Sequence, residues 1–208
     1  MDSKIEQVKK YELTTESKDY FGHKLFRIRA LISFKFVAKG ELGGFVESEK
    51  NVSHSGDAWV SGNAQVYGDA RVSGDAQVSG NAQVSGDAWV YGDAWVSGDA
   101  RVSGDARVSG NARVYGDAQV KISTDYFTAG PIGSRQSFIT FTKSNMSVAT
   151  GCFYGNIATF TAAVKKTHGT NEHAKNYLAL VKMVKSMWKQ DGKSARSKYK
   201  GETQSNSQ

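Results

Sequence analysis

A short glycine-rich segment in the C-terminal part of the chain carries the residues best suited to hold a small anion. It reads Gly130-Pro131-Ile132-Gly133-Ser134-Arg135. Glycine lets the backbone approach a ligand closely, Ser134 offers a hydroxyl, and Arg135 can hold a phosphate through two parallel hydrogen bonds. The segment lacks the spacing and the Lys of a Walker loop, and a Gly-Pro turn between two strands explains it equally well. We predict a phosphate-like ligand at Gly130, Gly133, Ser134 and Arg135, with an ordinary turn as the alternative.

Basic residues further along the chain can add positive charge to this segment. The predicted set is Lys165, His168 and His173, and Lys166 and Lys175 lie beside them. His168 and His173 flank the turn between two predicted helices, but one Cys and scattered His do not supply the four ligands of a zinc site. We therefore predict no metal, no cofactor and no catalytic residue.

The elements that must position this segment are organised around residues 56–120. Glycine stands there eleven times at a spacing of six, from Gly56 to Gly116, followed each time by Asp or Asn, Ala, a variable residue and Val. A period this short is typical of a β-solenoid. Ala-X-Val alternates like a strand, so that Ala58 and Val60 face inward and the residue between them faces outward. Gly and Asn or Asp supply the sharp corners, and one carboxylate at each turn favours structural use over calcium binding.

These repeats resemble the hexapeptide-repeat family, whose members form left-handed parallel β-helices with three hexapeptides in each triangular coil. The resemblance implies about three and two-thirds coils and a prism on the order of 18 Å tall. The layout of the whole chain is also similar to that of uncharacterised proteins of temperate phages and prophages. We expect a mainly β protein with a parallel, left-handed β-helix at 51–121, an N-terminal β cap at 1–50, a small basic α+β domain at 122–190 and a disordered basic tail at 191–208.

Eighteen residues per coil would sort the outward residues onto three faces. The first face carries Trp59, Gln77, Trp95 and Arg113, the second Gln65, Gln83, Arg101 and Gln119, and the third Arg71, Trp89 and Arg107. Tyr67, Tyr91 and Tyr115 step from one edge to the next. Outward Trp, Tyr and Arg are typical of binding hot spots, and members of the resembled family commonly form trimers through such walls. The predicted interface residues are Trp59, Trp89, Trp95, Arg113, Tyr67, Tyr91 and Tyr115, with self-association preferred over another partner.

The segments on either side of the repeats complete the predicted fold. Strands at 9–13 and 24–31 are predicted within the cap, and because Gly44 lies on the six-residue grid the first coil is expected to start near it. After Lys121 we predict strands at 126–128, 137–142 and 146–153. Helices follow, one ending at Gly169 and one from Glu172 to Lys189.

Charge is spread unevenly along the chain. Residues 51–120 carry four Arg and eight Asp, whereas residues 121–208 carry thirteen Lys or Arg and four Asp or Glu. A basic domain on an acidic prism attracts an anionic partner, and solubility alone is the plain alternative. The lysine-rich second helix lacks the Asn, Gln and Arg that read base edges, so we expect at most nonspecific contact with nucleic acid. The single Cys152 and the charged N-terminus without an apolar run predict a cytoplasmic protein without a membrane segment.

Three classes of function remain open on this basis. The first is a non-enzymatic binding and assembly protein that oligomerises and presents its basic domain to a nucleotide or a host protein, in counter-defence if the phage resemblance holds. The second is an acyltransferase, the commonest activity in the resembled family, for which His54 is the only His near the coils and lies at the place of an inward Val. The third is a filament or virion component. We rank the binding protein first.

Overall fold

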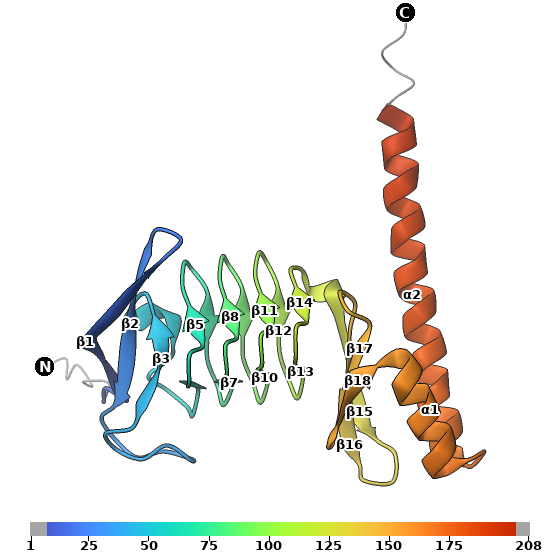
Figure 1. Ribbon diagram of the computed structural model, residues 1–208, viewed down its shortest axis with the longest axis horizontal. Coiled ribbons are helices and arrows are strands. Elements are labelled where there is room, and N and C mark those ends of the chain that lie inside the picture. Colours follow the sequence, from blue (N-terminus) through green and yellow to red (C-terminus); the bar gives the residue numbers. More distant parts are fainter. Residues whose placement is uncertain (1–7, 203–208) are drawn as a thin grey trace, which may run out of the picture.

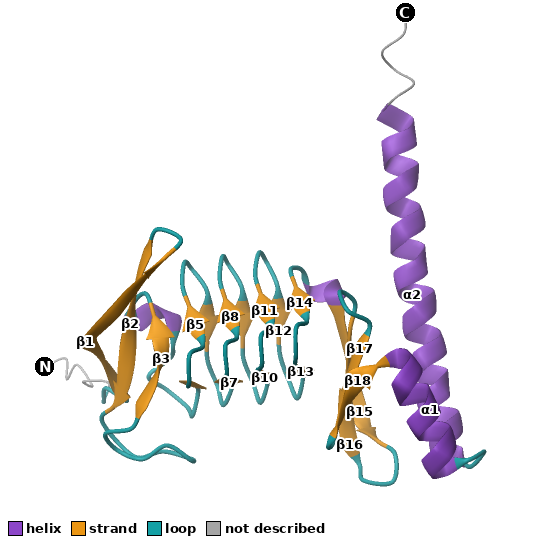
Figure 2. Ribbon diagram, viewed as in Figure 1, coloured by secondary structure: helices purple, strands orange, loops and turns teal. Residues whose placement is uncertain are grey.

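A computed structural model describes residues 8–202, with side chains described through Lys189. It is mainly β, with a parallel β-solenoid of about four turns between an N-terminal cap and a C-terminal sheet covered by two helices (Figures 1 and 2). The predicted fold class is therefore confirmed. No helix within the described residues is long and apolar enough to span a membrane.

The solenoid consists of eleven two-residue strands separated by tight corners. They are β4 (Trp59–Val60), β5 (Gln65–Val66), β6 (Arg71–Val72), β7 (Gln77–Val78), β8 (Gln83–Val84), β9 (Trp89–Val90), β10 (Trp95–Val96), β11 (Arg101–Val102), β12 (Arg107–Val108), β13 (Arg113–Val114) and β14 (Gln119–Val120).

Each strand pairs in parallel with the strand eighteen residues away, which produces three walls. The first wall is β4, β7, β10 and β13, the second contains β5, β8, β11 and β14, and the third is β6, β9 and β12. These walls reproduce the three predicted faces. The Ala and Val of every repeat are fully buried and form one continuous core.

Glycine is required at the corners for two reasons that act together. Gly92 has a φ of +70°, and a Cβ there would lie 3.0 Å from the backbone nitrogen of Gly110 in the next coil. An L side chain is disfavoured at that φ, and the stacked backbone leaves no room for one. The strict six-residue recurrence of glycine follows from this corner geometry.

The N-terminal cap extends the second wall. Strands β1 (Tyr11–Tyr20), β2 (His23–Ala30) and β3 (Leu42–Val46) pair antiparallel with one another, and β3 then pairs in parallel with β5. A short 3₁₀ helix, η1 (Glu49–Asn51), follows. The strands predicted in the cap are present, and the first of them is longer than predicted.

The first coil departs from the six-residue grid that the sequence predicts at Gly44. Phe45 pairs with Gln65 and Val52 bridges to Val72, each twenty residues apart instead of eighteen. The corner at 53–58 is therefore two residues longer than the others. His54 lies in this enlarged corner, and Val52 takes the inward place that we had assigned to His54.

Each end of the solenoid exposes backbone groups that no neighbouring coil pairs. Between coils, some N–H groups donate to carbonyls of the following coil, as from Trp59 N to Ala76 O at 3.0 Å. The first coil is consequently left with carbonyl oxygens, such as those of Gly56 and Ala58, that need donors, and the last coil with N–H groups, such as that of Arg113, that need acceptors. The last coil also leaves carbonyls to be paired, such as that of Arg107. Each cap must pair the groups left at its end.

The side chains of the caps match this requirement. At the N-terminal end, Lys10 Nζ donates to Gly56 O at 3.0 Å and to Ala58 O at 2.8 Å, and Asn51 Nδ2 reaches two further carbonyls. At the C-terminal end, two hydroxyl oxygens accept: Thr140 Oγ1 from Arg113 N at 2.9 Å, and Ser144 Oγ from Gln119 N at 2.7 Å. Two tyrosine hydroxyls donate there, that of Tyr126 to Arg107 O at 2.9 Å and that of Tyr154 to Tyr115 O at 3.1 Å. Both ends are closed within the chain, which argues against the filament alternative.

The C-terminal domain begins after a 3₁₀ helix, η2 (Ser123–Asp125). Its antiparallel sheet contains β15 (Tyr126–Ile132), β16 (Ser137–Thr142), β17 (Ser147–Thr150) and β18 (Phe153–Asn156), and the helices are α1 (Ile157–His168) and α2 (Glu172–Glu202). The single strand predicted at 146–153 is wrong, because Gly151, with a φ of +52°, turns the chain there into a hairpin of two strands. The sheet stands across the end of the solenoid with the helices on its far side (Figure 1).

Helix α2 continues beyond Lys189 to Glu202 and so enters the segment that we expected to be disordered. Lys and Arg, which are frequent in this segment, are good helix formers. The rest of the predicted tail, 203–208, lies outside the described residues.

Candidate functional site

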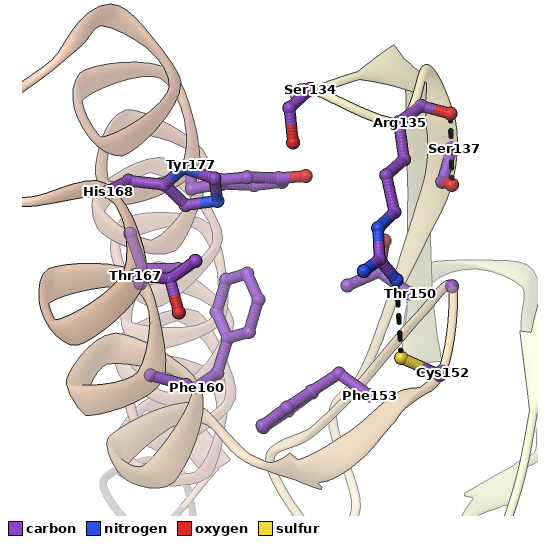
Figure 3. A pocket seen from close by; sticks show the side chains of 13 residues that line it. Ser134, Arg135, Ser137, Thr150, Cys152, Phe153, Phe160, Thr167, His168 and Tyr177 are labelled. Atoms are coloured by element: carbon purple, nitrogen blue, oxygen red, sulfur yellow. Dashed lines mark hydrogen bonds between the residues drawn. The ribbon is translucent and has the colours of Figure 1, made fainter.

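A cavity of about 260 Å³ lies between the β15–β16 turn and the two helices. Arg135 and Ser134 reach it from the turn, His168 from the end of α1 and Tyr177 from α2 (Figure 3). Phe153 and Phe160 line its lower part. These two rings lie 5.2 Å apart, and Phe160 lies 5.5 Å from the ring of Tyr177 in an edge arrangement.

The structure brings together part of the predicted anion site. Ser134, Arg135 and His168 all line the cavity. Gly133 lies directly over the Tyr177 hydroxyl, where a Cβ would come within 1.9 Å of that oxygen. Glycine at 133 therefore makes room for the tyrosine.

The other predicted ligand residues do not line the cavity. Gly130 packs against Phe138, which makes it a structural glycine. Lys165 is exposed on α1 away from the lining, and His173 contacts the ring of His168 at 5.6 Å from outside it. Within the described residues, no group of three or more His, Cys, Asp or Glu is placed to hold a metal ion.

Two polar groups of the cavity have no partner that explains them. Among the described residues, no Asp or Glu forms a salt bridge with Arg135. Its guanidinium makes one hydrogen bond to a described side chain, from Nη1 to the Cys152 sulfur at 3.5 Å. Tyr177 is only 8% exposed, and its hydroxyl makes no hydrogen bond with another described residue. Burial raises the pKa of Tyr177, so at neutral pH this hydroxyl keeps its proton and can donate it.

Sequence reasoning missed the aromatic lining of the cavity. Phe160 and Tyr177 lie in helical stripes that predict core residues, and both do belong to the core of this domain. The cavity is an opening at one end of that core, beside the β15–β16 turn. It exists because of the way the turn packs against the two helices, which the sequence pattern does not predict. The six-residue turn segment was the sole sequence signal for the site.

A second candidate surface is a corner of the solenoid where the third wall meets the first. Trp89, Tyr91 and Trp95 are 40%, 37% and 42% exposed there. The guanidinium carbons of Arg71 and Arg107 lie 5.5 and 5.3 Å from the ring of Trp89, above and below it in the wall. Arg113 lies 5.7 Å from Trp95 in the same way. We call these residues the aromatic corner.

The remaining predicted interface residues are covered by the caps. Trp59, expected to face outward, is only 2% exposed because it lies beneath the cap in contact with Tyr11 and Phe34. Tyr67 packs against the cap at Tyr20, and Tyr115 packs against Tyr154 of the C-terminal sheet. The expectation of an exposed Trp59 is wrong. The six-residue repeat correctly predicts that its side chain points away from the solenoid core, but it does not predict that the cap lies over it.

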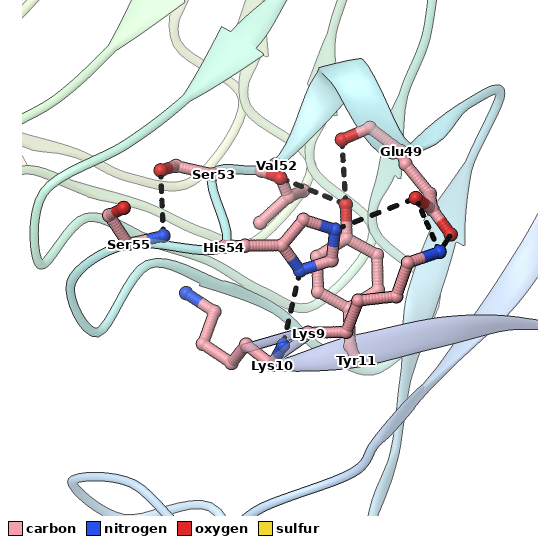
Figure 4. A network of polar contacts seen from close by, with 8 residues as sticks. All are labelled: Lys9, Lys10, Tyr11, Glu49, Val52, Ser53, His54 and Ser55. Carbon is pink, nitrogen blue, oxygen red and sulfur yellow. Dashed lines mark hydrogen bonds and ion pairs between the residues drawn. The ribbon is translucent and has the colours of Figure 1, made fainter. Parts of the chain in front are cut away.

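His54, the candidate base of the acyltransferase alternative, is built into the cap (Figure 4). Its ring stacks on Tyr11 at 4.4 Å, Nδ1 accepts the backbone N–H of Lys10 at 3.2 Å, and Nε2 lies 3.7 Å from a carboxylate oxygen of Glu49. Burial lowers the pKa of His54. Both ring nitrogens face groups of the chain itself, an arrangement suited to fastening the cap.

The geometry defines the chain as a β-solenoid protein with a sheet-and-helix domain at one end. The model of the YdcK beta solenoid repeat family matches it at residues 64–80, 76–92, 82–98, 94–109 and 106–121. All five matches fall in the solenoid, so this similarity concerns the coils and leaves the cap and the C-terminal domain aside. No curated protein matches the chain.

Proposed function

We propose that the protein is a non-enzymatic binding and assembly protein whose solenoid is a rigid support and whose C-terminal domain binds an anionic small molecule. The observation that carries this proposal is Arg135, a guanidinium without a carboxylate partner in the described chain, placed over a cavity with an aromatic lining. Arg135 is exposed, so an anion can reach its guanidinium, and the charge-assisted hydrogen bonds that it would form are stronger than neutral ones.

Calorimetric titration with a panel of anions, including nucleotides, tests the binding. We expect heat from at least one member of the panel, reduced by Arg135→Gln and unchanged by Lys165→Gln, which removes an equal charge outside the cavity. Equal losses in both variants would indicate that only the net charge of the domain matters. Absence of heat from every anion would remove the proposal.

The aromatic corner supports the assembly part of the proposal. Three adjacent exposed aromatic rings, with arginines beside both tryptophans, form the kind of patch that mediates protein contacts, and a homotrimer is the assembly we favour. Sedimentation velocity should show an oligomer that dissociates when Trp89 and Trp95 are both changed to Ser. Gln83→Ala on the second wall should leave the oligomer intact, and a monomeric wild-type protein would refute this part.

The resemblance of the chain's layout to that of phage and prophage proteins suggests a role for the binding in counter-defence in the host cytoplasm, either by trapping a nucleotide signal or by covering a host protein. Failure of all nucleotides in the titration above, with another anion still binding, would eliminate the trapping version. The acyltransferase alternative is retained only if a coupled acyl-CoA assay shows turnover that His54→Ala abolishes.

A further inference from the structure

We infer that the ligand of the cavity carries a single anionic group on one apolar ring, as in an aryl carboxylate or an aryl phosphate, and is not a nucleotide. This inference rests on the proposed binding of an anion by the C-terminal domain, and it replaces the nucleotide-trapping version of that proposal. It is drawn from the composition, the size and the donor geometry of the cavity.

The charge of the lining sets the charge of the ligand. Arg135 is the only Lys or Arg among the lining residues, and no Asp or Glu lines the cavity. One guanidinium matches one carboxylate or phosphate group, which it can bind through two parallel hydrogen bonds. A polyphosphate would bring several charges and meet only one permanent cation.

The lining also favours an apolar ring over a nucleobase. Apart from Arg135 and His168, the polar side chains of the cavity are the hydroxyls of Ser134, Ser137, Thr150, Thr167 and Tyr177 and the thiol of Cys152. The paired hydrogen bonds that distinguish nucleobase edges come mainly from Asn, Gln and Arg, with Asp or Glu accepting from amino groups, and no Asn, Gln, Asp or Glu lines this cavity. The ring of the ligand instead faces Phe153, Phe160 and Val164.

The size of the cavity agrees with one ring and one small head group. At about 260 Å³, it is smaller than the roughly 300–1,000 Å³ typical of sites for drug-sized ligands. A purine, a ribose and a phosphate together would extend out of it.

Two donors are placed to meet the anionic group from opposite sides. Arg135 comes from the sheet side of the cavity, and the Tyr177 hydroxyl points across it from α2 (Figure 3). Tyr177 is more than nine-tenths buried and its hydroxyl has no partner in the described chain. An anion between these two groups would satisfy both at once, while its ring would lie against Phe153 and Phe160.

Calorimetric titration of the full-length protein with matched probes tests the inference. Benzoate and phenyl phosphate carry a ring and a charge, inorganic phosphate lacks the ring, benzyl alcohol lacks the charge, and AMP replaces the apolar ring with a purine nucleoside. We expect binding of benzoate, phenyl phosphate or both, and the ratio of their dissociation constants distinguishes a carboxylate ligand from a phosphate ligand. Inorganic phosphate, benzyl alcohol and AMP should bind at least about 10-fold more weakly, as expected when one of the two contact types is lost.

Variants locate the binding. Arg135→Gln should weaken the better probe by about 10-fold or more, because it removes hydrogen bonds to a charged group. Tyr177→Phe should weaken it by about 3-fold or more through the loss of one hydrogen bond, and Lys165→Gln should leave it unchanged. Arg135 is exposed, so its substitution should not affect folding, and circular dichroism checks this for each variant.

Three outcomes decide the inference. Tight binding of a ring-bearing anion with the expected variant pattern supports it. AMP or inorganic phosphate binding as tightly as phenyl phosphate, and depending on Arg135, would overturn the ligand class and leave the proposed anion binding in place. Absence of binding by every probe, together with absence of heat in the wider anion panel, would overturn both.

Discussion

Replacement of Lys10 by Met tests whether carbonyls of the first coil that no other coil pairs must receive a hydrogen bond from the cap. Lys10 is 1% exposed, and its ammonium group donates to Gly56 O and Ala58 O and lies 5.0 Å from the ring of Phe34. Met has a similar shape but no donor. Leaving the buried carbonyl of Ala58 and the partly buried carbonyl of Gly56 without this donor should cost up to about 2–6 kcal/mol, at about 1–3 kcal/mol for each fully buried group.

The pH dependence of this difference is more diagnostic than its size. Burial lowers the pKa of Lys10 from 10.5 to about 8, against the opposing effect of Asp57 and Asp75. Between these two values the unfolded chain binds the proton and the folded protein does not, so the stability contributed at this site rises with pH. Lowering a pKa by this amount corresponds to about 3 kcal/mol, of which about 2 kcal/mol should appear between pH 7 and pH 9.5.

Urea unfolding at several pH values from 7 to 9.5 measures the effect. The free energy of unfolding of the wild-type protein should rise relative to that of Lys10→Met by about 2 kcal/mol across this range. Lys9→Met is a matched control, because Lys9 forms only an exposed pair with Glu49 and its loss should cost less than about 1 kcal/mol. Above about pH 10 the buried Tyr11 hydroxyl, whose pKa is raised by burial, acts in the opposite direction. Parallel pH curves for the wild-type protein and Lys10→Met would refute the reasoning.

Three further substitutions probe the solenoid, its C-terminal end and the cap. Val90→Asp should cost several kcal/mol because it buries an unpaired charge in the core, whereas Gln83→Ala should change stability by less than about 0.5 kcal/mol; urea unfolding that ranks the two equally would contradict the core assignment. Thr140→Val should cost about 1–3 kcal/mol by leaving the N–H of Arg113 without an acceptor, and amide hydrogen exchange at Arg113 should speed up in that variant. Because burial lowers the pKa of His54, stability at this site is lost as the pH falls below about 6.5, where only the unfolded chain gains the proton. Thermal melts at pH 7 and pH 5.5 should therefore show a smaller acid shift for His54→Gln than for the wild-type protein, and equal shifts would count against this assignment.

The interior of the solenoid could be predicted in detail because its rule is local. A strand alternates sides every residue and a corner recurs every six, so Ala58, Val60 and their equivalents had to share one interior. The wall assignment of Trp95 against Arg113 followed from the same count, and the strand pairing agrees with it. No information from distant parts of the chain was needed.

The predictions that were wrong depend on contacts between distant parts of the chain. Trp59 points outward from its wall as expected, but Tyr11 and Phe34, which lie 48 and 25 positions earlier in the chain, cover it. The longer corner around His54 follows no repeat, because it adapts the first coil to Lys10 and to Tyr11 at the start of β1. Sequence periodicity carries no information about such docking.

The residues of the candidate cavity could be predicted from the sequence only in part. Ser134 and Arg135 could be selected from the sequence because glycine, hydroxyl and guanidinium groups stand together in six residues. Phe160 and Tyr177 could be predicted to be buried but not to end at an opening, since that depends on where the turn meets the helices. Lys165 was included on charge alone, and charge does not give the direction of a side chain on a helix.

Strand β16 contacts both the solenoid and the C-terminal helices, because its side chains point alternately to the two faces of the sheet. Ile139 and Phe141 face the helices and belong to the core beside the cavity, whereas Thr140, between them, faces the solenoid and accepts the N–H of Arg113. The strand that supplies an acceptor to the last coil thus also supports the domain that holds Arg135. A shift of the sheet by one residue would put Ile139 and Phe141 against the unpaired N–H groups and the threonines into the apolar core. The register of one strand therefore fixes the C-terminal domain to the solenoid, and hydrogen bonds to the last coil hold the domain directly against it.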